Sequence, residues 1–110
     1  MGSAFPQAQG LSLADRLSGN TSRITFCVLS DGAAMEGEAK EAMAAVAGLA
    51  KKGRMSPFVL IITDNNTKLS GRIDQDSFSM NPTFSSLESL GWRVIRLENG
   101  NDLQACAAVL

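Results

Sequence analysis

Two short polar clusters, each directly after an apolar run, hold the side chains of this sequence that are best suited to chemistry. Asp31 and Gly32 follow the first run, and Asp64-Asn65-Asn66 follow the second. Carboxylate and amide oxygens suit Mg²⁺, which usually also takes phosphate oxygens and water. A glycine at the start of a helix lets backbone N–H groups meet a phosphate. Together the clusters predict an Mg²⁺ site beside a diphosphate.

The composition excludes several other chemistries. The chain has no histidine, so it supplies no histidine base, no Ser-His-Asp triad and no His-rich zinc site. Ten Lys+Arg against eleven Asp+Glu give a net charge of −1, which argues against binding to nucleic acid or to a membrane surface. The apolar run 58–62 is too short to span a bilayer. Two cysteines make no disulfide framework, so a reduced, cytoplasmic setting is expected.

Alternating helix and strand patterns predict the elements that position the two clusters. Strands are expected over 23–29, 57–63 and 92–97, and helices over 8–18, 35–52, 81–91 and from 102 onward. This order predicts βαβ units, a parallel sheet and a Rossmann-like three-layer αβα fold. The run 57–63 is apolar almost throughout, which suits a strand covered on both faces. Ligands bind beyond the carboxyl ends of such strands, so both clusters are expected to face one crevice.

The predicted sheet is incomplete. Its three strands leave two edges open, and the sequence stops inside the last expected helix, on the apolar pair Val109-Leu110. These features predict that residues 1–110 form part of a larger domain.

Five segments occur in order along the chain: Pro-Gln-Ala-Gln-Gly at 6–10, Leu-Ser-Asp-Gly-Ala-Ala-Met-Glu-Gly at 29–37, Glu-Ala at 41–42, Asp-Asn-Asn-Thr-Lys-Leu-Ser-Gly at 64–71 and Leu-Gly-Trp-Arg-Val-Ile at 90–95. They resemble the sequence motifs of transketolases, which depend on thiamine diphosphate. The first is similar to the family's Pro-Leu-Gly-Gln-Gly loop. The second and fourth are similar to the two halves of its cofactor motif. The resemblance covers nearly the whole chain and implies a partial thiamine diphosphate-binding domain over residues 1–110.

The resemblance implies a role for each matching residue of the cofactor motif. Asp31 is the implied metal carboxylate, and Gly32 offers its N–H to the diphosphate. Asn65 supplies the metal-binding amide, with Asn66 as the alternative, and Thr67 supplies a carbonyl. The implied cofactors are thiamine diphosphate and Mg²⁺, or Ca²⁺ in its place.

Three further residues receive implied roles outside that motif. Glu36 matches a glutamate that joins an acidic network across a dimer interface. Gln9 and Gly10 match a loop that lies against the cofactor. Two departures accompany these matches, because Ser30 and Ala8 each stand where the family pattern has glycine.

The family likeness implies an enzyme of pentose phosphate chemistry that transfers two-carbon ketol units between sugar phosphates. Its pyrimidine-binding domain is missing from this sequence, which implies a further domain or subunit in a homo- or hetero-oligomer. The chain alone is therefore expected to be inactive. The alternatives are a non-catalytic α/β module or fragment, and a piece of deoxyxylulose-phosphate synthase or of a 2-oxoacid dehydrogenase α-subunit.

Overall fold

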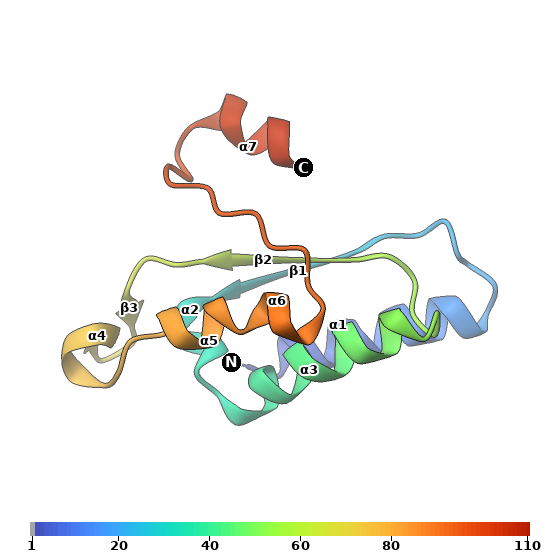
Figure 1. The fold of residues 1–110 in the computed structure, drawn as a ribbon, viewed down its shortest axis with the longest axis horizontal. Helices are drawn as coiled ribbons and strands as arrows, with labels where there is room; N and C mark the ends of the chain where they lie inside the picture. The colour runs from blue at the N-terminus through green and yellow to red at the C-terminus, as the bar shows by residue number, and fades with distance from the viewer. Residues whose placement is uncertain (1) are drawn as a thin grey trace.

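Two parallel strands form the centre of the structure, a computed structural model that describes residues 2–110 (Figure 1). Strand β1 (Thr25–Ser30) pairs with β2 (Phe58–Thr63) in a register that aligns their first and last residues. Aromatic and β-branched side chains, which favour extended backbone, are frequent in both strands. The parallel pairing brings the carboxyl ends of β1 and β2 to one edge, as the sequence predicts.

Two long helices cover one face of this sheet (Figure 1). Helix α1 (Ala4–Leu17) contacts both β1 and α3 (Gly37–Lys51), and α3 connects the two strands. The short helix α2 (Asp31–Ala34) directly follows β1. Ser30 Oγ accepts a hydrogen bond from Ala33 N over 3.1 Å, so the hydroxyl caps α2 rather than crowding the turn.

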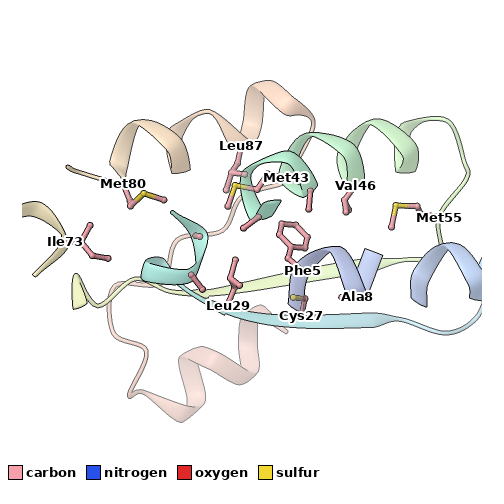
Figure 2. Packing of buried hydrophobic residues seen from close by; sticks show 14 residues of the cluster. Phe5, Ala8, Cys27, Leu29, Met43, Val46, Met55, Ile73, Met80 and Leu87 are labelled. Carbon is pink, nitrogen blue, oxygen red and sulfur yellow. The ribbon is translucent and has the colours of Figure 1, made fainter. Parts of the chain in front are cut away.

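The core lies between this helical layer and the sheet (Figure 2). Phe5 of α1 is fully buried, and its ring centroid lies 5.7 Å from that of Phe58 and 6.2 Å from that of Trp92. Leu29 and Cys27 point into the same layer from alternate positions of β1. Met43 and Val46 close the layer from α3, so the chain builds one contiguous core on one side of its sheet.

The opposite face of β1 is uncovered. Phe26 and Val28 are 55% and 63% exposed, although they alternate with buried neighbours along the same strand. Strand β2, for which the sequence predicts cover on both faces, is half-buried from Phe58 to Ile62, so the uncovered part of the sheet lies on β1.

The strand expected over 92–97 is not formed. Three contacts anchor this segment: Trp92 N donates to the Leu87 carbonyl over 3.1 Å, Trp92 Nε1 donates to the Met43 carbonyl over 2.7 Å, and an Arg96 nitrogen lies 3.3 Å from Asp64 Oδ2. The backbone makes no ladder with β2, so β-branched composition alone did not produce a strand. The described residues thus hold two parallel strands where three were predicted.

Residues 64–80, between the predicted strand 57–63 and the predicted helix 81–91, contain an antiparallel hairpin and a short helix. Strand β3 (Thr67–Lys68) pairs with β4 (Gly71–Arg72), and α4 (Ile73–Asp76) follows. Both strands have only two residues, which is too short for a periodic pattern to predict.

The remaining helices largely follow the prediction. The helix expected over 81–91 is present as α5 (Asn81–Ser85) and α6 (Leu87–Leu90), which ends at Gly91 with a positive φ of 113°. Helix α7 (Leu103–Val109) stands apart from the rest of the structure (Figure 1). No helix within residues 2–110 combines the length and apolar character needed to cross a membrane.

Candidate functional site

Asp31 is the buried acid at the carboxyl edge of the sheet. It begins α2 directly after β1, and only 1% of its surface is exposed. Its Oδ1 accepts a hydrogen bond from Gly32 N over 2.9 Å, and its Oδ2 accepts one from Asn66 N over 2.6 Å. The carboxylate thus joins the end of β1 to the loop after β2. A carboxylate offers about four lone-pair positions, so these two bonds leave acceptor capacity.

Gly32 allows two backbone segments to approach closely. A Cβ at this position would lie 3.3 Å from the Thr67 carbonyl oxygen and 3.4 Å from Lys68 Cβ. Such contacts are tight, so a side chain at 32 would push β3 away from α2. The absence of that side chain brings the Thr67 carbonyl, one of the implied ligands, against the start of α2.

The two candidate amides differ in their surroundings. Asn66 adopts the left-handed region at φ 57°, which asparagine tolerates better than most residues. Its Nδ2 donates to Asp74 Oδ1 over 2.6 Å, and its Oδ1 accepts from Asp74 N over 2.9 Å, so both side-chain polar atoms are engaged. Asn65 is exposed, and its Oδ1 accepts one hydrogen bond from Thr67 N over 3.1 Å.

Two cavities adjoin these segments. The larger has a volume of about 420 Å³, within the range of roughly 300–1,000 Å³ typical of small-molecule sites. It is lined by Ser30, Gly32, Glu36, Thr67, Lys68, Leu69 and Ser70. The smaller, of about 230 Å³, is lined by Asp31, Asp64, Asn66, Ile73, Asp74, Ser79, Met80 and Asn81. Gly32 lines the larger cavity and Asp31 the smaller one, whereas Asn65 lines neither.

The structure separates the three residues that were expected outside the cofactor motif. Glu36 lines the larger cavity, and its Oε2 accepts a hydrogen bond from Gly2 N over 3.1 Å. Gln9 and Gly10 lie within α1 and line neither cavity. The loop expected at 6–10 is wrong, because Pro6 occupies the first helical turn, where a backbone N–H needs no partner within the helix. Contact between these residues and a cofactor stays a prediction.

Several residues at these cavities were not anticipated as site residues. Lys68 and Ser70 line the larger cavity from the hairpin, and Asp74 lines the smaller one from α4. Gly71, directly after the turn between β3 and β4, was the one sequence feature that could have indicated this hairpin, because glycine is favoured at the last position of a type I turn.

The oxygen donors at this edge are of the chemical kind that a magnesium–diphosphate group requires. The Asp31 carboxylate, the Asn65 amide oxygen and the Thr67 carbonyl are hard oxygen donors, which Mg²⁺ and Ca²⁺ both accept. Residues 2–110 contain no cluster of three or more His, Cys, Asp or Glu side chains that could hold a metal by itself. Phosphate oxygens and water would therefore complete the shell, and Gly32 lines the larger cavity, from which a ligand could reach the start of α2.

Comparison with known proteins gives a consistent family. Residues 12–110 match the family described as "Transketolase, thiamine diphosphate binding domain". The transketolase of Staphylococcus aureus strain MW2 is 32% identical over 113 residues, which cover 94% of this chain and 16% of that protein. The transketolase of Geobacillus stearothermophilus is 30% identical over 119 residues, which cover 100% of this chain and 17% of that protein. The chain thus spans 16–17% of the length of these relatives.

Proposed function

Because the chain belongs to the family of transketolase thiamine diphosphate-binding domains, we propose that it binds the magnesium–diphosphate end of thiamine diphosphate. One observation carries this proposal. The buried Asp31 carboxylate bonds to Asn66 N across the carboxyl edge of the sheet, beside the close approach of Gly32 and the Thr67 carbonyl. This edge is where ligands of open parallel sheets bind.

In this proposal each residue has one task. Asp31 and Asn65 donate side-chain oxygens to Mg²⁺, and Thr67 donates its backbone carbonyl. Asn65 is preferred to Asn66 because Asp74 engages both polar atoms of the Asn66 side chain. Gly32 lets β3 lie close to α2 and lines the larger cavity, where its backbone N–H would face the diphosphate.

We further propose that this site serves an enzyme that moves two-carbon ketol units between sugar phosphates in the cytoplasm. When bound, thiamine diphosphate supplies the electron sink for carbon–carbon bond cleavage and formation. The described residues provide the diphosphate end alone, so a pyrimidine-binding domain or subunit must supply the other half. Glu36, at the rim of the larger cavity, is the residue assigned to contact that second polypeptide.

A second candidate is a non-catalytic α/β module. The uncovered face of β1 favours it, because an exposed apolar sheet face is typical of a surface that binds another polypeptide. A module of this kind would remain folded and would leave the cofactor unbound. The family match favours transketolase over deoxyxylulose-phosphate synthase and over the 2-oxoacid dehydrogenase α-subunit.

Thermal unfolding tests the proposal directly. Thiamine diphosphate at about 100 times its dissociation constant should add about 2.7 kcal/mol to the free energy of unfolding. The proposal predicts a rise in Tm with Mg²⁺ present and none after chelation with EDTA, while the chain alone shows no ketol transfer. An unchanged Tm under both conditions, in a chain that circular dichroism shows to be folded, would favour the non-catalytic module.

A further inference from the structure

We propose that Lys68 binds the diphosphate group directly, an inference that rests on the proposed function and adds a cationic side chain to its site. Lys68 lines the larger cavity together with Gly32 and Thr67. It is the one cationic side chain in that lining. An ammonium group is a compact point charge and a common partner of phosphate oxygens.

The hairpin that carries Lys68 is fastened at both ends. Asn66 N donates to Asp31 Oδ2 over 2.6 Å immediately before β3, and Arg72 N donates to Asp76 Oδ2 over 2.8 Å in β4. Gly71 has φ 146° and packs against the same Asp76 carboxylate, which leaves no space for a side chain there. The backbone of Lys68 is therefore positioned before any ligand arrives, which lowers the ordering cost of binding.

Lys68 is also oriented within the cavity. Its Nζ donates a hydrogen bond to Ser70 Oγ over 2.9 Å, and both residues line the same space. Its Cβ lies 3.4 Å from the position that a Gly32 Cβ would occupy, so the stem of the lysine begins beside the start of α2. Ser70 is neutral, so it holds the ammonium group without cancelling its charge.

The charges at this edge explain what Lys68 contributes. A diphosphate ester carries several negative charges at neutral pH, and the Asp31 and Glu36 carboxylates lie at the two adjoining cavities. A divalent metal neutralises only part of this negative charge. Lys68 offsets more of it, and it does so at the diphosphate rather than at the thiamine rings.

Calorimetric titration of the full chain with thiamine diphosphate and Mg²⁺ tests this assignment. Lys68→Met should weaken binding about tenfold or more, the usual loss for a hydrogen bond to a charged group. Lys51→Met makes the same charge change at an exposed position of α3 and should bind as the unsubstituted chain does. Ser70→Asp keeps the lysine but neutralises it, so it should reproduce the loss, whereas Ser70→Ala should cost less.

The outcomes separate this inference from the proposed function. Equal binding by the unsubstituted chain and Lys68→Met would overturn the role of Lys68 and leave the proposed function standing. If the unsubstituted chain does not bind thiamine diphosphate, the proposed function fails, and magnesium with inorganic diphosphate becomes the probe for Lys68. A tenfold loss in Lys68→Met with that probe would still support the assignment, and equal or absent binding would overturn it.

Discussion

The two faces of strand β1 differ sharply although the same strand forms both. On the inner face, Leu29 and Cys27 pack against Phe5 and Met43 (Figure 2). On the outer face, Phe26 remains half-exposed, with Val28 two residues further on. The residue types are equally apolar, so side-chain chemistry does not account for the difference. What differs is the cover, because α1 and α3 pack on one side alone (Figure 1).

This difference shows where the stability of the chain comes from. Apolar area stabilises a fold only when it leaves water, at about 25 cal/mol per Å². Cys27 and Leu29 leave water almost completely, whereas Phe26 and Val28 keep more than half of their surface in solvent. The inner layer therefore supports the candidate site at its edge, and the outer face is the surface most prone to association.

Substitution of matched phenylalanines gives the largest expected effect. Phe5→Ala should lower the free energy of unfolding by about 3–5 kcal/mol, because it empties a fully buried position between two aromatic rings. Phe26→Ala should cost about 1 kcal/mol. Urea unfolding followed by circular dichroism measures both values, and Phe5→Leu provides a milder variant if Phe5→Ala does not fold. Equal losses at the two positions would contradict the one-sided core.

Trp92 tests whether the segment 92–97 belongs to the inner layer. Trp92→Phe keeps an aromatic ring but removes the 2.7 Å hydrogen bond to the Met43 carbonyl, which should cost about 1 kcal/mol. Unfolding is again followed by circular dichroism, because the substitution removes the single tryptophan and with it the tryptophan fluorescence signal. A cost near zero would mean that the segment contributes nothing to the inner layer.

The outer face should influence association more than stability. The double change Phe26→Ser with Val28→Thr should shift the chain toward monomer in gel filtration at equal concentration. The free energy of unfolding should change by about 1 kcal/mol or less, because both side chains are already largely in water. A matched pair on the inner face, Cys27→Ser with Leu29→Thr, should instead unfold the chain. An unchanged elution volume would remove the outer face as an association surface.

The smallest expected effect concerns the two cysteines, which are unpaired. Burial raises the pKa of the Cys27 thiol, so the folded state disfavours its thiolate. Its contribution to stability is complete below the unfolded thiol's pKa of about 8.5 and declines as pH rises toward the folded value. Between pH 7 and 9.5 the free energy of unfolding should fall slightly, and less so in Cys27→Ala. Iodoacetamide should modify Cys106 well before Cys27, and equal rates would contradict the burial of Cys27.

Sequence reasoning predicted the elements that depend on local periodicity. The runs 23–29 and 57–63 gave β1 and β2 within two residues at each end, and the 3.6-residue period gave α3. The predicted helix 8–18 begins four residues later than α1, because Pro6 is compatible both with a loop and with the first turn of a helix. The segment 92–97 has strand composition, but pairing depends on backbone contacts that composition does not encode.

The candidate site was predictable in its residues and less so in its geometry. Asp31 and Asn66 were expected near one edge because parallel strands end together, and the hydrogen bond between them joins those ends. The reciprocal pairing of Asn66 with Asp74 depends on the turn through α4, for which the sequence carries no periodic signal. Lys68 was not predicted as a site residue, because its place at the larger cavity depends on the two-residue strand β3, which also has no periodic signal in the sequence.

Calorimetric titration of thiamine diphosphate into the purified chain, with the single change Asp31→Ala, tests the central claim most directly. The account predicts binding that requires Mg²⁺ and disappears in Asp31→Ala. It should persist in Asp15→Ala, a control that removes a carboxylate paired with Arg23 and lining neither cavity. Binding that survives Asp31→Ala, or no binding by the folded, unsubstituted chain, would contradict the account.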